Sequence, residues 1–221
     1  MRTLAANLCL RGRKALLIGA GSVGSRKLAY LLGSGAAITV VEPYPEPWLD
    51  DLRDAGRIGL VPVFSEGLLE GDPLIFLATE PAPYQGLIRE ALGRGLWVNV
   101  AGSPELGNMT LPALAEDGPF RLAVSTGGAS PALARRVAER LREGYRGYGD
   151  LCKVLMALRP HVLGSDLGPD GRRAVLARLA GSNALAASLG EGRLEDALGL
   201  IGQLLEPLGT PPGFSLAFLK E

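Results

Sequence analysis

The sequence has 221 residues, of which 47% are hydrophobic and 5% aromatic, and its 23 Lys and Arg residues balance 23 Asp and Glu residues. This balance excludes a global electrostatic field that would recruit nucleic acid or an anionic membrane, and no apolar run reaches the roughly 18 residues that span a bilayer. Because Arg11, Arg13 and Lys14 interrupt the first apolar stretch, the N-terminus does not fit a secretory signal, and we expect a cytoplasmic protein.

The first half of the chain alternates short apolar runs with helical patterns. Lys14–Ile18 and Ala37–Val41 are expected strands on either side of a helix at Ser22–Leu32, which makes a βαβ unit. Further along, we expect a helix at Pro47–Ala55, strands at Gly59–Val63 and Leu74–Ala78, a helix at Tyr84–Gly93 and a strand at Leu96–Val100. Such alternation predicts an α/β fold with a parallel sheet and right-handed crossovers.

The pattern changes after Pro112. A last strand at Phe120–Ser125 leads through TGGASP into a long Arg-rich helix at Pro131–Tyr145. The remainder of the chain shows helical segments around 150–158, 169–180, 182–190 and 193–206, with no convincing strand. We therefore expect a small helical domain over 150–221, within which the final GTPPGFSLAFLKE holds too many Gly and Pro residues to be assigned.

The run GAGSVG stands directly between the first strand and the first helix. Its glycines, Gly19, Gly21 and Gly24, have the GxGxxG spacing that lets a backbone turn and a helix N-terminus approach a pyrophosphate. Glu42 ends the second strand 23 residues after Gly19, near the place of an acid that binds a ribose 2′-hydroxyl. This carboxylate would repel a 2′-phosphate, so the pattern predicts NAD in preference to NADP, unless Lys27 and its neighbour Arg26 soften the repulsion. The alternative is that the glycines only let the helix pack closely and that Glu42 is solvated.

A second motif lies at Ser125–Pro131. Ser130 suits a helix N-cap, Pro131 suits the first helical position, and Gly127 and Gly128 free the backbone to approach an anion. The alternative is a capped helix with a flexible lead-in. The helix that follows carries arginines suited either to a polycarboxylate or to solvation, namely Arg135, Arg136, Arg140, Arg142 and Arg146.

Three runs of residues, GAGSVGSRK, VNV and above all LAVSTGGASPALARRVAERL, resemble the precorrin-2 dehydrogenases of sirohaem synthesis. This family includes the N-terminal module of sirohaem synthase and enzymes that are also sirohydrochlorin ferrochelatases. The resemblance covers residues 1 to about 150. It implies a homodimer with an NAD-binding Rossmann domain over 1–112, a dimerisation region over 113–149 and a helical domain over 150–221. It also implies NAD-dependent oxidation of precorrin-2, a tetrapyrrole rich in carboxylates, to sirohydrochlorin.

The same resemblance implies roles for individual residues. Ser22 and Val23 correspond to family positions at the cofactor pyrophosphate, Glu42 and Pro43 to positions at the adenosine ribose, and Thr79 to one that lines the nicotinamide. For the tetrapyrrole it implies a seat formed by Ser125, Gly127, Gly128 and Ser130.

One position departs from the family pattern. Where the family reads VNVVDDP, this chain reads VNVAGSP, so Gly102 replaces the aspartate that the family is thought to use for proton transfer and metal chelation. Glu105, Asn108 or water would have to accept the proton instead, and Glu105 is the only ionisable residue of the stretch 97–108. Two functions follow, a dehydrogenase with a replaced base or a non-catalytic protein that binds tetrapyrrole and NAD. Iron insertion is not expected.

The two cysteines, Cys9 and Cys152, are isolated, and no CxxC motif or Cys/His cluster accompanies them. Neither a disulfide framework nor a metal site is therefore predicted. We expect buried free thiols in a reducing compartment.

Overall fold

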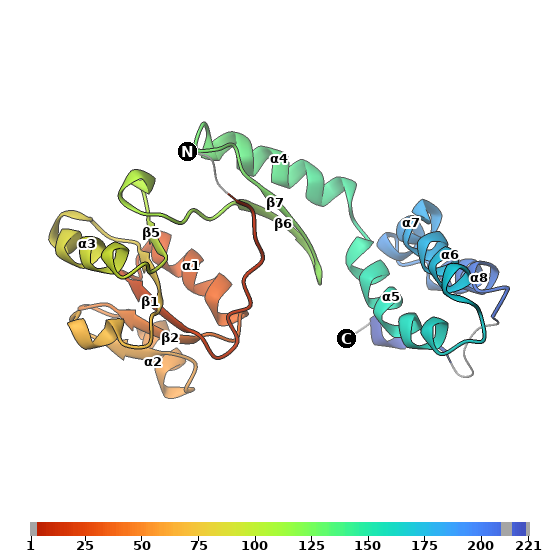
Figure 1. Cartoon of the computed structure of the whole chain (residues 1–221), viewed down its shortest axis with the longest axis horizontal. Coiled ribbons are helices and arrows are strands. Elements are labelled where there is room, and N and C mark those ends of the chain that lie inside the picture. Colours follow the sequence, from red (N-terminus) through yellow and green to blue (C-terminus); the bar gives the residue numbers. More distant parts are fainter. Residues whose placement is uncertain (1–3, 209–213, 220–221) are drawn as a thin grey trace. The chain divides into compact units, whose positions relative to one another are not determined.

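The computed structural model describes residues 4–208 and 214–219, and it divides the chain into two compact units (Figure 1). The N-terminal unit is Leu4–Leu111, and the C-terminal unit begins at Pro112. The tail that the sequence left unassigned is described only over 214–219, where Ala217–Leu219 forms a 3-10 helix, η4.

The N-terminal unit is built on a parallel sheet of five strands. Their spatial order is β3-β2-β1-β4-β5, and the strands are β1 (Lys14–Ile18), β2 (Ala37–Val41), β3 (Gly59–Val61), β4 (Leu74–Leu77) and β5 (Val98–Val100). In the register of this sheet, Ile18 pairs with both Val41 and Leu77, and Leu77 pairs with Val100. The carboxyl ends of four strands therefore lie level at one edge, where ligands of open α/β sheets bind. The predicted fold class, a Rossmann-type α/β domain followed by helices, is confirmed.

Helices cover both faces of this sheet. α1 (Ser22–Leu32) and α2 (Pro47–Asp54) bury Leu28, Leu31 and Leu49 against one face, together with residues from β1, β2 and β4. α3 (Gln85–Gly93), preceded by the 3-10 helix η2 (Ala82–Tyr84), and the 3-10 helix η1 (Glu66–Leu69) pack on the other face. Because both faces are covered, strands such as β1 and β4 are continuous apolar runs rather than alternating ones.

The C-terminal unit begins with an antiparallel hairpin, which the sequence predicted only in part. β6 (Ala113–Asp117) pairs with β7 (Phe120–Val124), and α4 (Pro131–Gly144) packs on the pair through Ala134 and Ala138 (Figure 1). Strand β6 was missed because Ala, Glu and Asp are depleted in strands, so ALAED carries no strand signal. β6 is therefore a strand because it pairs with β7.

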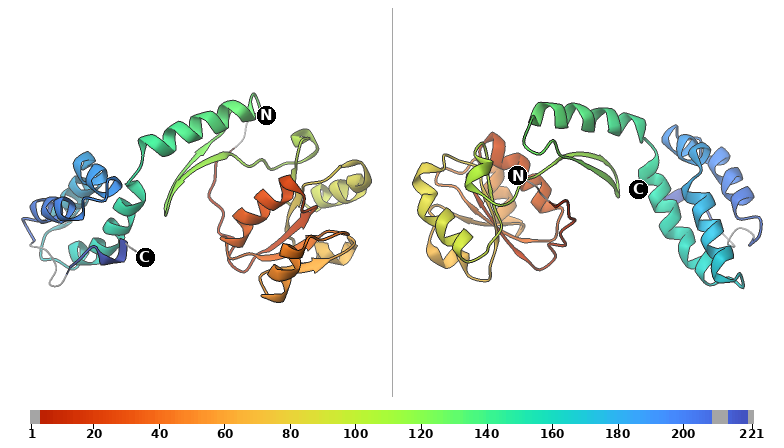
Figure 2. Two further views of the ribbon diagram at one scale, coloured as in Figure 1. Left: turned by 180° about the vertical axis from the view of Figure 1, so that it is seen from behind. Right: turned by 45° about the horizontal axis from the view of Figure 1, so that its top comes forward.

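The helices α5 (Tyr148–Leu163), α6 (Pro169–Ala180), α7 (Asn183–Gly190) and α8 (Leu194–Leu204) form a bundle with its own core (Figure 2). The predicted end of the first of these helices near residue 158 was wrong, since α5 continues through Pro160 to Leu163. Proline removes one backbone donor from the helix. The burial of Leu158 and Val162, one helical turn apart, offsets that loss.

The expected buried thiols are a second correction. Cys9 is exposed, because it lies in the coil before β1, and Cys152 is half-buried on α5. Burial raises the pKa of the Cys152 thiol, and the charge of Asp117 raises it further, so this thiol is protonated at neutral pH.

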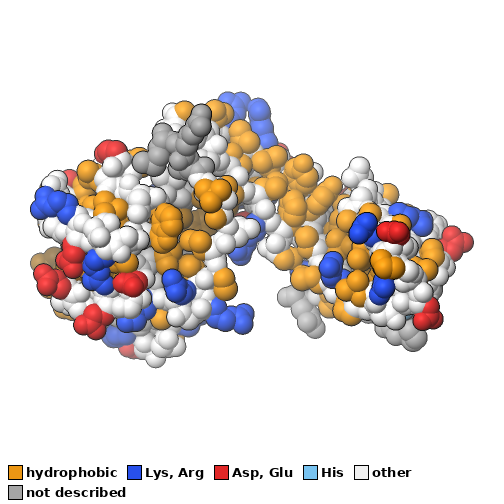
Figure 3. Space-filling model, viewed as in Figure 1, with side chains coloured by type: hydrophobic (Ala, Val, Ile, Leu, Met, Phe, Trp, Pro, Cys, Tyr) orange, Lys and Arg blue, Asp and Glu red, His pale blue; other side chains and the backbone are white. Residues whose placement is uncertain are grey.

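The surface carries both signs of charge, interspersed over the face that Figure 3 displays. This distribution agrees with the zero formal net charge. Within 4–208 and 214–219, no helix has the length and apolar character that crossing a membrane requires.

The carboxylate of Asp117 joins the hairpin to the helical bundle. Its Oδ2 atom accepts hydrogen bonds from the backbone N–H groups of Gly147 and Gly149, each at 2.9 Å. Gly147 has a φ of +88°, a conformation that favours glycine. The end of β6 thereby fixes the start of α5.

We expect Asp117→Ala to lower the free energy of unfolding of the C-terminal unit by about 2–3 kcal/mol, because two backbone donors lose a charged acceptor. Urea denaturation measures this loss. Glu116→Ala is the matched control on the same strand, since the Glu116 carboxylate pairs with the largely exposed Arg121 and its removal should cost less than about 1 kcal/mol. Equal losses for the two variants would contradict the proposed role of Asp117.

Candidate dinucleotide and anion sites

The glycine loop between β1 and α1 depends on two close contacts. Gly19 has a φ of +86°, and its N–H donates to the Val41 carbonyl at 2.9 Å, which continues the β1–β2 ladder past the strand end. A Cβ atom on Gly24 would overlap the Gly19 carbonyl oxygen, so only glycine lets α1 start this close to the sheet. By contrast, no protein atom described by the structure lies within 4 Å of the place a Cβ would take on Gly21. The loop is thus closely packed at Gly19 and Gly24 and open at Gly21.

The start of α1 is prepared for a negative charge. Gly21 is its N-cap, and among the described residues no side chain caps the helix and no acidic residue lies in its first turn. The first backbone N–H groups of a helix have no partner within the helix, and its dipole is positive at this end. Ser22 and Val23, the predicted pyrophosphate positions, are the first two residues of α1 and are exposed.

Glu42 is held beside this loop. Its Oε2 atom accepts from the Ala20 N–H at 2.8 Å, and its Oε1 atom accepts from the Tyr44 N–H at 3.2 Å. Each carboxylate oxygen keeps a further lone pair for a hydroxyl donor. The structure thus brings the predicted ribose residues, Glu42 and Pro43, to the glycine loop.

Thr79 reaches the same loop from β4. Its Cβ atom lies 3.0 Å from the place a Cβ would take on Gly19, and the Ala78 N–H donates to the Ile18 carbonyl at 2.8 Å. All of the predicted cofactor residues therefore gather at the carboxyl edge of one sheet.

The turn after β5 carries the predicted proton-transfer residues. Gly102 is exposed with a φ of +81°, and Glu105 is exposed in the 3-10 helix η3 (Pro104–Leu106). The amide of Asn108 is engaged with backbone: its Oδ1 accepts from the Val98 N–H at 2.8 Å, and its Nδ2 donates to the Leu96 carbonyl at 2.9 Å. Asn108 thus fastens the turn, which leaves Glu105 as the group in this turn that is able to exchange a proton.

The hydrogen bond that joins α1 to β5 was not predicted from the sequence. The Lys27 ammonium on α1 donates to Asn99 Oδ1 at 2.6 Å, and Asn99, only 5% exposed, donates to the Met109 carbonyl at 2.9 Å. Burial lowers the pKa of Lys27 below its ordinary value near 10.5, and the charge of Arg26 lowers it further. Lys27 is therefore not ordinary helix surface. The signal was the polar Asn99 inside the otherwise apolar strand β5.

In the C-terminal unit, the segment Ser125–Pro131 is a hydrogen-bonded turn. Ser130 caps α4, since its Oγ accepts from the Leu133 N–H at 3.2 Å. Thr126 Oγ1 accepts from the Ser130 N–H and donates to the Ser130 carbonyl, both at 3.1 Å, while Ser125 Oγ accepts from the Gly127 N–H at 3.3 Å. Thr126, which the sequence did not single out, organises this turn.

Two exposed glycines lie in the same turn, and exposed arginines follow along α4 and just beyond it. Gly127 and Gly128 have φ values of +61° and +89°, so their backbone lies in the left-handed region. The guanidinium-bearing residues that follow are all exposed, namely Arg135, Arg136, Arg140, Arg142 and Arg146. An exposed glycine backbone followed by arginines early in the next helix suits an anionic ligand.

Comparison with known proteins matches both units. Residues 6–113 match the family described as "Putative NAD(P)-binding", and residues 117–143 match the family described as "Sirohaem biosynthesis protein central". The solved structure named SirC, precorrin-2 dehydrogenase, superposes with a TM-score of 0.74 and 26% sequence identity, and the match covers 91% of this chain and 100% of that one.

Curated relatives agree with these matches. The siroheme synthase of Methylococcus capsulatus is 37% identical over 86% of this chain and 40% of its own length. The siroheme synthase of Nitrosococcus oceani is 31% identical over 93% of this chain and 44% of its own length. The chain thus spans less than half the length of either relative.

The fold and the first match define the class, a protein with a Rossmann-type NAD(P)-binding domain. More particularly, the chain is similar to proteins of sirohaem biosynthesis, namely the siroheme synthases and the precorrin-2 dehydrogenase structure. The resemblance inferred from the sequence is confirmed.

Two glycine substitutions separate ligand binding from folding. Gly21→Ala adds a methyl group where no protein atom lies near, so we expect less than about 1 kcal/mol loss of stability but a loss of dinucleotide affinity of roughly tenfold or more. Gly24→Ala should lower both stability and affinity, since its methyl group meets the Gly19 carbonyl. Thermal unfolding and NAD⁺ titration by calorimetry measure the two effects. Unchanged affinity in Gly21→Ala would contradict a pyrophosphate seat above Gly21.

Proposed function

We propose that this protein is an NAD-dependent dehydrogenase that oxidises precorrin-2 to sirohydrochlorin in sirohaem synthesis. The observation that carries the proposal is the complete glycine loop with the Glu42 carboxylate held beside it by Ala20 and Tyr44. The likeness to a precorrin-2 dehydrogenase structure over its whole length supports it. The division into an NAD-binding domain over 1–112, a dimerisation region over 113–149 and a helical domain over 150–221 is part of the proposal, as is a homodimer.

The loop fits a dinucleotide because it is open at Gly21 and its helix start is uncapped by any described side chain. NAD⁺, when bound, supplies the acceptor for a hydride. Glu42 favours NAD⁺ over NADP⁺, because its charge repels a 2′-phosphate. The residues that would hold the cofactor are Gly19, Gly21, Ser22, Val23, Gly24, Glu42, Pro43 and Thr79.

The substrate seat is the turn at the start of α4. The exposed backbone at Gly127 and Gly128 and the arginines of α4 suit the carboxylates of a tetrapyrrole. Ser125 and Ser130 shape this seat through their hydrogen bonds to the backbone.

Oxidation of precorrin-2 removes a hydride and a proton, and the proton needs an acceptor. Gly102 has no side chain to receive it, and the Asn108 amide is occupied by backbone. Glu105, three residues beyond Gly102, is the acceptor in this proposal, with solvent beyond it. Iron insertion is not proposed, because it needs an acceptor for the pyrrole protons and the aspartate that the family is thought to use is replaced by Gly102. A non-catalytic protein that binds tetrapyrrole and NAD is the second candidate, favoured by glycine at position 102.

The decisive experiment generates precorrin-2 under anaerobic conditions and adds NAD⁺ or NADP⁺. Stoichiometric NADH and sirohydrochlorin, faster with NAD⁺ and well above the protein-free rate, are expected. No turnover, together with saturable binding of NAD⁺ and sirohydrochlorin, would favour the non-catalytic candidate.

Glu42→Gln tests the cofactor preference. Removal of the charge should raise the ratio of kcat/KM with NADP⁺ to kcat/KM with NAD⁺ by about tenfold, or ~1.4 kcal/mol of relieved repulsion. The amide retains one oxygen for the backbone donors that Glu42 binds, and comparing cofactors within one variant cancels any loss of folded protein. An unchanged ratio would show that Glu42 does not face the ribose.

Glu105→Ala tests the proton acceptor. We expect kcat to fall by roughly 10²-fold or more with NAD⁺ affinity unchanged, and Gly102→Asp in the same chain should restore the rate. Space for the new side chain exists, since no described atom lies within 4 Å of a Cβ on Gly102. Glu66→Ala is the matched control, because Glu66 is likewise exposed in the first turn of a 3-10 helix. Equal rates for wild type and Glu105→Ala would remove Glu105 from the mechanism.

A further inference from the structure

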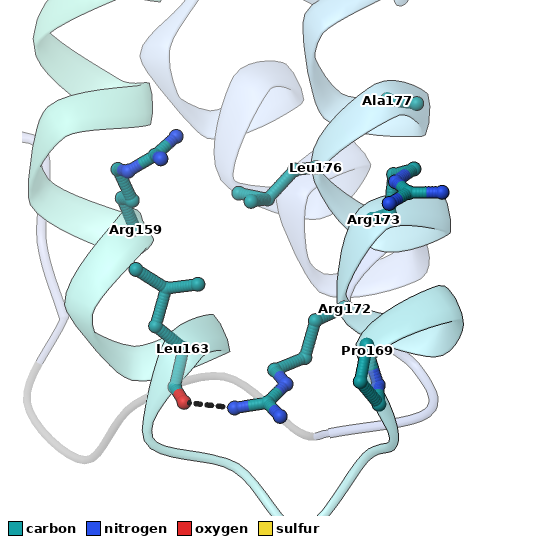
Figure 4. A pocket seen from close by; sticks show the side chains of 7 residues that line it. All are labelled: Arg159, Leu163, Pro169, Arg172, Arg173, Leu176 and Ala177. Atoms are coloured by element: carbon teal, nitrogen blue, oxygen red, sulfur yellow. Dashed lines mark hydrogen bonds between the residues drawn. The ribbon is translucent and has the colours of Figure 1, made fainter.

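The helical bundle contains a hollow of its own between α5 and α6, with a volume of about 550 Å³ (Figure 4). Its lining comes from Arg159 and Leu163 on α5 and from the first two turns of α6, including Arg172, Arg173 and Leu176. All of these residues belong to the C-terminal unit, and none belongs to the turn at Ser125–Pro131. The volume lies within the range of small-molecule sites.

Three of the residues that line the hollow are arginines, and none of the described lining residues is acidic. In Figure 4 the side chains of Arg159 and Arg172 lie beside the gap between α5 and α6, whereas that of Arg173 lies on the outer side of α6. Arg172 is held in place, since its Nη1 donates to the Leu163 carbonyl at 2.8 Å, and its other N–H groups stay available. Arg173 Nη1 lies 3.5 Å from Asp170 Oδ1, and both side chains are largely exposed, so this ion pair is weak. The positive charge of the hollow is therefore not neutralised from within.

The wall between the arginines is apolar. In Figure 4 the side chains of Leu163 and Leu176 extend into the space between the helices, with Arg159 and Arg172 toward opposite ends of the leucine pair. Leu163 is 45% exposed, so the wall is accessible from outside. A small hydrated anion would bind the guanidinium groups but leave these leucines unused, whereas a ligand with an apolar body would bury them.

We propose that this hollow is a second ligand site, which binds a polycarboxylate carried on an apolar body. The guanidinium groups pair with carboxylates, and the leucines pack against the body of the ligand. Tetrapyrroles with acidic side chains are one such class. The site is independent of the proposed dehydrogenase function, because its residues lie outside the cofactor and substrate seats described above.

The test uses the full chain and coproporphyrin as the probe, an apolar macrocycle with propionate carboxylates. Titration followed by porphyrin fluorescence should show saturable binding of coproporphyrin and weaker binding of its neutral methyl ester. Tricarballylate, which has carboxylates but no apolar body, should displace coproporphyrin only weakly. Arg159→Gln should lower the affinity for coproporphyrin by about three- to tenfold, and Arg173→Gln should lower it less, because the Arg173 side chain lies on the outer side of α6. Neither residue caps a helix, so folding should be retained.

Arg178→Gln is the matched control, since Arg178 is exposed on α6 like Arg173 but does not line the hollow. Its affinity should equal that of the wild type. Three results would each overturn the proposal: no binding to the wild type, equal affinity in the lining variants and the control, or tricarballylate binding as tightly as the porphyrin. NADH formation from precorrin-2, measured on the same variants, should be unchanged. This second assay distinguishes a failure of the dehydrogenase proposal from a failure of the second-site proposal.

Discussion

The approach of α1 to the sheet at Gly24 and Gly19 is the contact on which the dinucleotide site depends. Because the helix residue has no side chain, the helix starts directly above the end of β1 and directs its free N–H groups over the carboxyl edge. The hydrogen bonds from Gly19 to Val41 and from Ala78 to Ile18 keep neighbouring strand ends level at that edge. A larger residue at position 24 would move the helix start away from the strand ends.

Two charges determine the electrostatic potential at the carboxyl edge of the sheet: the partial positive charge of the backbone at the start of α1 and the negative charge of the Glu42 carboxylate. The start of α1 attracts a negative charge, and Glu42 sets a negative charge beside it without capping the helix, since it binds Ala20 and Tyr44 instead. A ligand that joins an anionic pyrophosphate to a neutral ribose satisfies both groups. The proposed preference for NAD⁺ rests on the Glu42 carboxylate, which would repel a second phosphate on the ribose.

The local sequence pattern predicted most of the helices and strands, but it did not predict the features that depend on contacts with other parts of the chain. The strand β1 and the loop at Gly19 were readable because buried parallel strands are apolar and glycine spacing is local. Strand β6 was not readable, because Ala113–Asp117 becomes a strand only through pairing with β7. The bond between Lys27 and Asn99 joins residues 72 positions apart, and the backbone bonds of Asn108 require the fold of the turn, so neither follows from spacing alone.

An aspartate at position 102 would both form the turn and exchange a proton, whereas the glycine found there only forms the turn. Its φ of +81° costs an L-residue roughly 1–2 kcal/mol, and aspartate is among the side chains that tolerate this conformation best. The backbone therefore remains compatible with the family residue, while in the proposed reaction an exposed group or water would accept the proton. In the proposed reaction, hydride transfer depends on how the cofactor and substrate are held, and position 102 is not among the residues proposed to hold them. Glycine there would slow proton removal without removing the driving force of a nicotinamide reaction.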